Sequence, residues 1–165
     1  MQLIRETDRL YRLTRMGMVN CFFVAEEDGL TLVDTNLFGS ASAILAAAER
    51  IGSLIRRIVL THAHIDHVGS LADLCKRLPE VEWMIGKREA KLLTGNLSLE
   101  PGETGKKLFG FFPVNLQPTR LLNDGDRVGS LLVMTSAGHT PGHTSYFDIR
   151  DAHSLQVMRS RRRLD

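Results

Sequence analysis

Five of the six histidines of this chain fall in two short segments that are far apart in the sequence. Residues 61–67 read Thr-His-Ala-His-Ile-Asp-His, and residues 138–143 read Gly-His-Thr-Pro-Gly-His. Neutral imidazole is a principal ligand of zinc and similar divalent ions, and carboxylate is the next choice where thiolate is absent. The pattern therefore predicts a metal site, and it requires a fold that brings the two segments together.

Cysteine takes no part in this prediction, because the chain has only two cysteines and they are far apart. Cys21 and Cys75 lack the close spacing of a thiolate metal site, and two cysteines do not make a disulfide scaffold. Any metal must therefore be held by histidine and carboxylate.

The spacing within the segments indicates which side chains can share an ion. His62 and His64 are two positions apart, so both can point to one side of an extended chain. Asp66 and His67 follow on the adjoining turn and can face a second ion, while His139 lies beyond another predicted strand end. His143 is assigned a structural or supporting role next to the ligands, and the sixth histidine, His153, fits no pattern.

Hydrophobic periodicity predicts alternating strands and helices, and hence an α/β sandwich with functional loops at strand ends. An Asp-Gly pair at residues 28–29 predicts a tight hairpin. Residues 94–118 form a long irregular loop with three phenylalanines, expected either to cover a site or to pack against the domain. The expected strands are 21–25, 30–33, 58–60, 81–85 and 131–135, and the expected helices are 40–51, 70–78 and 87–93.

Composition limits the class of protein. With 165 residues, 43% of them hydrophobic and 24% charged, the chain has the profile of one globular domain. Charges or glycines interrupt every apolar run, which excludes an integral membrane protein, and the charged N-terminal residues 1–15 lack the features of a secretory signal. We therefore expect a cytoplasmic protein.

The net charge of +2 comes from the end of the chain. Residues 151–165 hold four arginines and two aspartates, so the remaining residues are balanced in charge. A neutral body with an arginine-rich tail does not favour a nucleic-acid partner.

The two histidine segments also carry a family resemblance. Residues 61–67 resemble the HxHxDH signature of the metallo-β-lactamase superfamily, and Ser-Ala-Gly-His-Thr-Pro-Gly-His at 136–143 is similar to its next motif. Leu-Val-Asp-Thr at 32–35 resembles the strand-end Asp motif of that family, and Asn-Cys at 20–21 resembles its usual strand start. The resemblance covers residues 1–150 and implies an αβ/βα sandwich and a hydrolase with one or two metal ions.

The resemblance also implies a role for each site residue. His62, His64 and His139 would bind the first ion, and Asp66 and His67 would contribute to the second. Asp34 would support the ligands, although an aspartate that simply ends a strand is the alternative. The implied ion is zinc (Zn²⁺), with iron or manganese equally compatible with these ligands. Zinc acidifies a water that can attack an ester, thioester, lactone or amide, and Asp66 would be catalytic by orienting or deprotonating it.

The family pattern then stops, because the metal-bridging aspartate and the last histidine are absent. Neither His153 nor the terminal Asp165 matches them. Residues 152–160 can be back-translated into codons and read in a shifted frame that starts at the third base of the Ala152 codon. Allowed codons then encode Thr-Leu-Ile-Ala-Gly-Asp-Ala-Phe, which matches the missing strand and its Gly-Asp. We hypothesise that residues 1–150 form a domain with an incomplete second half and that 151–165 are translated out of frame. A genuine short variant with a basic tail is the alternative.

Three functions follow from these observations. The leading hypothesis is a metal-dependent hydrolase of small molecules, of which this chain is an N-terminal portion with at most one tight metal and weak or absent turnover. The second is a non-catalytic remnant that binds metal or a partner, and the third, a nucleic-acid processing member, rests on the arginine tail alone. Loss of the second half would leave apolar sheet surface exposed. The sequence leaves the substrate, the metal and the oligomeric state open.

Overall fold

The computed structural model describes residues 1–103, 109–150 and 153–155. Within these residues, no helix combines the length and the hydrophobicity that a membrane crossing requires. The elements in chain order are β1 (Gln2–Arg5), β2 (Leu10–Arg15), β3 (Val19–Glu26), β4 (Gly29–Val33), α1 (Ala41–Ile51), β5 (Ile55–Leu60), α2 (Ile65–Val68), α3 (Leu71–Arg77), β6 (Glu82–Gly86), α4 (Lys87–Leu93), β7 (Arg120–Leu122), β8 (Arg127–Val128), β9 (Leu131–Thr135), β10 (Thr144–Asp148) and β11 (His153–Leu155).

The larger of two sheets combines an antiparallel half with a parallel half. In the described part of the chain it has seven strands in sequence order, β1 to β7. Strands β1 to β4 pair antiparallel, with the predicted hairpin at Gly29, whereas β4 to β7 pair parallel. Parallel strands need crossover connections, which α1, then α2 and α3, and then α4 provide. The carboxyl ends of β4 and β5 therefore lie at one edge of the sheet.

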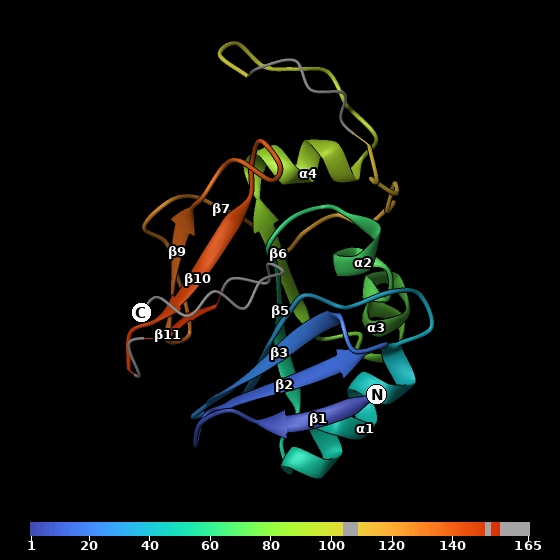
Figure 1. The fold of residues 1–165 in the computed structure, drawn as a ribbon, viewed down its shortest axis with the longest axis vertical. Coiled ribbons are helices and arrows are strands. Elements are labelled where there is room, and N and C mark those ends of the chain that lie inside the picture. Colours follow the sequence, from blue (N-terminus) through green and yellow to red (C-terminus); the bar gives the residue numbers. More distant parts are fainter. Residues whose placement is uncertain (104–108, 151–152, 156–165) are drawn as a thin grey trace.

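The smaller sheet packs on the other face of the larger one. Over the described residues it is antiparallel, in the order β11-β10-β9-β8. One apolar cluster fills the space between the helices and the larger sheet, and a second one, which includes Val59, Val133 and Tyr146, lies between the sheets. Helices, larger sheet and smaller sheet thus form successive layers (Figure 1). The sandwich that the family resemblance implied is confirmed, with its second half incomplete.

The outer face of the smaller sheet is apolar and partly exposed, as expected for an incomplete sandwich. Leu132 and Phe147 are paired across β9 and β10 and are half-buried. Met134 is 46% exposed and Ile149 is 42% exposed. Exposed apolar surface of this kind favours association.

Two parts of the chain differ from the sequence prediction. Residues 1–15, for which no strand was predicted, form β1 and β2, and residues 153–155, expected within a tail, form β11, which pairs with β10. Of residues 151–165, to which the out-of-frame hypothesis applies, 151–152 and the arginine-rich 156–165 lie outside the described residues.

Glu26 links the two sheets through polar contacts. One carboxylate oxygen accepts hydrogen bonds from the Ser130 backbone nitrogen at 3.0 Å and from the Ser130 hydroxyl at 2.9 Å. The other lies 3.1 Å from the Arg150 guanidinium, and the Glu26 side chain is only 8% exposed. Glu26 thus joins the end of β3 to the strands of the smaller sheet.

Replacing Glu26 with alanine is expected to lower the free energy of unfolding by about 2 kcal/mol, because it leaves buried donors without their charged acceptor. Urea unfolding of the full chain measures this loss. Glu27→Ala, at an exposed neighbouring position, is the control and should change stability by less than about 0.5 kcal/mol. Equal stability of the two variants would contradict the role of Glu26 as a link between the sheets.

Candidate metal centre

The histidines gather where strands of both sheets end. Strand β5 ends at Leu60, and His62 and His64 follow directly, with His64 in an extended conformation (φ −72°, ψ 150°). The chain then turns into α2, which carries Asp66 and His67. The loop between β9 and β10 brings His139 and His143 from the smaller sheet.

His62, His64 and His139 form a compact triangle. Their ring centroids are 4.7 Å apart for His62 and His64 and 4.8 Å apart for each of the other two pairs. One ring nitrogen of each residue lies within 4.8 Å of those of the other two. The structure therefore brings together the three residues predicted to share the first ion.

A chain of hydrogen bonds fixes the orientation of His62. The Thr61 hydroxyl donates to Asp34 Oδ2 at 2.8 Å and lies 2.9 Å from His62 Nδ1. Because the single hydroxyl proton goes to the carboxylate, His62 Nδ1 carries a proton and donates it to Thr61. His62 Nε2 then keeps its lone pair, and this atom is buried without a hydrogen-bond partner among the described residues. Such a nitrogen fits a metal ligand held by an outer carboxylate.

Burial and neighbouring charge keep two of these rings neutral. Burial, and then the nearby histidines, lower the pKa of His62 far below its usual range. Burial and His139 lower the pKa of His64 to about 4. Both residues are therefore uncharged near neutral pH, which is the form that binds a metal.

Asp66 and His67 lie beside this triangle. The His67 ring centroid is 4.0 Å from that of His62, and His67 Nε2 is 3.5 Å from Asp66 Oδ2. His67 Nδ1 is 2.7 Å from Asp34 Oδ2. Burial opposes protonation of His67, but the two carboxylates outweigh it and raise its pKa to about 10. The residues expected at a second ion are thus adjacent to the first group.

The sequence left two roles open for Asp34, supporting the metal ligands or simply ending a strand, and the structure shows features of both. It follows β4 with a left-handed backbone (φ 62°), as a strand-end aspartate would. It is also fully buried, and it accepts hydrogen bonds from the Thr61 backbone nitrogen at 2.8 Å as well as from the Thr61 hydroxyl. The Asp34 carboxylate therefore contacts His67 directly and reaches His62 through Thr61.

His143 lies next to the triangle but outside the group of mutually close nitrogens. Its ring centroid is 5.1 Å from that of His62, and its Nδ1 is 2.8 Å from the Ser136 hydroxyl. Its Nε2 is buried without a partner among the described residues. A supporting role for His143 stays a prediction.

The phenylalanine-rich loop borders the site with one part and packs into the core with another. The Phe111 ring is 4.6 Å from that of His64, and Ile65 donates its backbone N–H to the Gly110 carbonyl at 3.1 Å. Val114, by contrast, is 8% exposed within the core cluster. Part of the loop therefore lines the site, and another part packs against the domain. Residues 104–108 of the loop lie outside the described residues.

Sequence reasoning missed one buried acidic residue near the site. Glu89 in α4 is fully buried, and its carboxylate accepts hydrogen bonds from the backbone nitrogens of Ala63 and Gly142. Its spacing to Leu92 and Leu93 places it on the apolar face of the helix. A carboxylate on that face was a signal available in the sequence.

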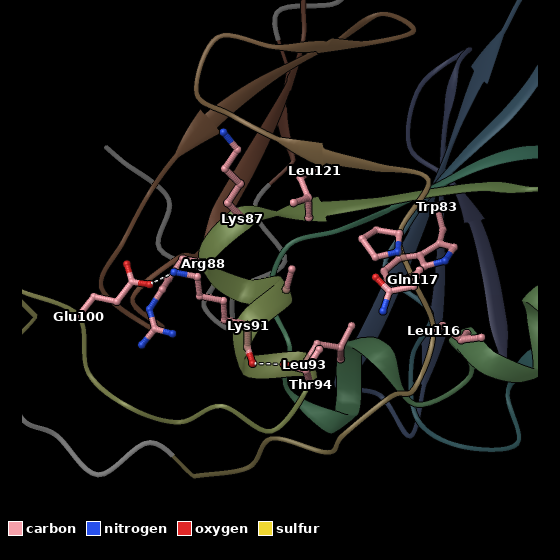
Figure 2. Close-up of a pocket in the computed structure, with 12 residues that line it drawn as sticks. Trp83, Lys87, Arg88, Lys91, Leu93, Thr94, Glu100, Leu116, Gln117 and Leu121 are labelled. Carbon is pink, nitrogen blue, oxygen red and sulfur yellow. Dashed lines mark hydrogen bonds and ion pairs between the residues drawn. The ribbon is translucent and has the colours of Figure 1, made fainter.

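A cavity of about 540 Å³ lies away from the histidines, between the outer side of α4 and the segment before β7 (Figure 2). Trp83, Leu116 and Leu121 contribute to its apolar lining. Two of its cationic side chains are paired with acidic ones, Arg88 with Glu103 and Lys91 with Glu100. None of the five clustered histidines lines this cavity.

Layered helices and sheets with a histidine triangle at the strand ends define a class of sandwich proteins with a candidate metal site. The family model of the metallo-beta-lactamase superfamily matches residues 14–151. The chain belongs to this superfamily, whose members bind metal ions.

Comparisons with individual proteins agree with this assignment. The chain is 42% identical over 135 residues to the uncharacterized protein YobT of Bacillus subtilis, a match of 81% of this chain and 58% of that protein. It is similar in structure to a beta-lactamase from Chitinophaga pinensis, with a TM-score of 0.70, 31% identity and coverage of 88% and 56%. The protein TTHA1623 in a di-iron-bound form gives a TM-score of 0.63, 28% identity and coverage of 82% and 64%. The chain thus spans less than two thirds of each relative.

Proposed function

We propose that this chain carries the metal-binding part of a hydrolase that acts on an ester, thioester, lactone or amide bond of a small molecule. The observation that carries the proposal is the triangle of His62, His64 and His139, in which a buried His62 Nε2 has no other described partner. We propose zinc as the ion, and the di-iron form of one relative shows that iron suits this fold as well.

We assign each residue of the site a separate role in hydrolysis. His62, His64 and His139 would hold the ion, and Asp34 would fix the His62 tautomer through Thr61. When bound, such an ion acidifies water and polarises a carbonyl group. The hydrogen bond from His67 lowers the pKa of Asp66, whose side chain is 43% exposed. Asp66 is therefore ionised and accessible, and it would accept the proton of the attacking water.

The main alternative is a metal-binding protein without turnover. We propose one tightly bound ion at the triangle of this chain and weak turnover, with Asp66 and His67 forming only part of a second site.

We also propose a cytoplasmic location and a small-molecule substrate. Cys21 and Cys75 are both free thiols, which suits a reducing compartment. The balanced charge of the body outside residues 151–165 argues against a nucleic-acid partner.

Metal removal tests the proposed hydrolysis. The zinc-loaded chain is expected to cleave at least one of a panel of nitrophenyl ester, thioester, lactone and β-lactam substrates, to stop after dialysis against EDTA, and to resume with added zinc. Asp66→Asn should lower kcat by about 100-fold while zinc content stays the same, because the proton acceptor is lost. Zinc binding without hydrolysis above the level of His139→Ala would instead support the non-catalytic alternative.

A further inference from the structure

The three ligands of the triangle come from two different sheets, so their spacing depends on contacts between two loops. His62 and His64 follow β5 of the larger sheet, whereas His139 lies in an exposed part of the loop between β9 and β10. Two contacts join the strands at the base of these loops. Thr144 donates its backbone N–H to the Thr61 carbonyl at 2.9 Å, and the Tyr146 hydroxyl donates to the Leu60 carbonyl at 2.8 Å.

Glu89 provides a third contact, which reaches into both loops at once. Its Oε2 accepts the backbone N–H of Ala63 at 2.9 Å, and its Oε1 accepts that of Gly142 at 2.9 Å. Ala63 lies between His62 and His64, and Gly142 lies three residues after His139. One carboxylate therefore holds the backbone beside all three predicted ligands.

The Glu89 carboxylate is fully buried, and hydrogen bonds from the two loops offset part of the cost of burying it. Burial raises the pKa of Glu89, which means that the surroundings disfavour its charge. The neighbouring Arg88 does not neutralise it directly, because its guanidinium binds Glu103. Two backbone N–H groups stabilise the carboxylate, and hydrogen bonds to a charged acceptor are the stronger kind.

Close packing confirms that the second loop rests directly on α4. A Cβ atom at Gly142 would lie 2.6 Å from Arg88 Cβ and 3.0 Å from the Glu89 backbone nitrogen. Only glycine permits this approach, so the loop position and the Glu89 contact depend on each other.

We infer that Glu89 is a positioning residue of the metal site: its carboxylate sets the distance between the His62–His64 pair and His139 and thereby raises the affinity for the ion. The inference rests on the proposed metal site. Glu89 does not touch the ion, and it acts through the backbone of the two ligand loops.

The Glu89→Gln variant tests this role with the full chain and zinc alone. The glutamine oxygen accepts one N–H, but its amide group faces the other donor, so one loop is released. Zinc affinity, measured by competition with a chromophoric chelator, should fall by about 10–100-fold, the usual effect of losing an outer partner of a metal ligand. Glu26→Gln is the matched control, because it removes a buried carboxylate that also accepts a backbone N–H, and its zinc affinity should stay within about twofold.

A second variant and a metal-free measurement complete the test. Gly142→Ala, which keeps Glu89 but moves the loop off α4, should weaken zinc binding in the same way. Without metal, amide exchange of Ala63 or Gly142 should be faster in Glu89→Gln than in the wild type. Wild-type zinc affinity in either variant would overturn the inference.

The wild type and His139→Ala separate the two possible failures. If both bind zinc equally, the proposed metal site is wrong and the inference falls with it. If His139→Ala loses zinc while Glu89→Gln binds it normally, only the role of Glu89 is wrong.

Discussion

Replacing His139 with alanine is expected to remove the zinc from the purified chain, which should otherwise hold about one ion. His139 supplies one of three nitrogens that lie within 4.8 Å of one another, and it is the ligand from the smaller sheet. Loss of an outer partner already weakens metal binding by about 10–100-fold, so loss of a ligand should cost more.

Elemental analysis of monodisperse protein measures this change. His153→Ala is the control, because His153 is the one histidine outside both motifs, and it should keep its zinc. Retention of zinc in His139→Ala would show that the triangle is not the site. Two zinc ions per wild-type chain would mean that other residues complete the second site, contrary to our expectation.

Replacing Asp34 with alanine is expected to lower the free energy of unfolding by about 3–5 kcal/mol, the cost of breaking a buried charged network. The change removes the acceptor for the backbone N–H and the hydroxyl of Thr61 and for His67 Nδ1. It also puts a residue that disfavours left-handed backbone at a φ of 62°.

Urea unfolding with a chelator present isolates this loss from any effect of bound metal. Asp34→Asn should lose less than Asp34→Ala, because asparagine tolerates the left-handed backbone and keeps one acceptor oxygen. Asp73→Ala is the control: Asp73 pairs with Arg77 on the helix surface, and its loss should change stability by about 0.5 kcal/mol or less. A loss below about 1 kcal/mol in Asp34→Ala would show that the network contributes little.

Local signals explain which elements the sequence predicts well. The hairpin at Gly29 depends on two adjacent residues, and the helix over 87–93 and the strand over 131–135 have the predicted bounds in the structure. The histidine triangle is also predicted from a local signal, the clustering of five histidines in two short segments, which is typical of a metal site.

What the sequence does not reveal depends on contacts between distant residues. Strands β1 and β2 lie at the edge of the larger sheet, where Arg5 and Arg12 make ion pairs on the surface and mask the apolar alternation. The position of Glu89 on the apolar face of its helix can be read from the sequence, but its partners cannot, because they are backbone N–H groups of two distant loops. The contact between Phe111 and His64 likewise depends on how a long loop returns to the sheet.

The division of the metal ligands between two sheets also sets the order of events in folding. Strands β1 to β4 pair with their neighbours along the chain, and such local contacts form early. His64 and His139 are 75 residues apart, so they meet only after β9 and β10 have been made and have docked. We therefore expect the complete set of three ligands to be available to an ion only late in folding. Because its binding energy adds to the folding energy, it should act mainly by slowing the separation of the two sheets.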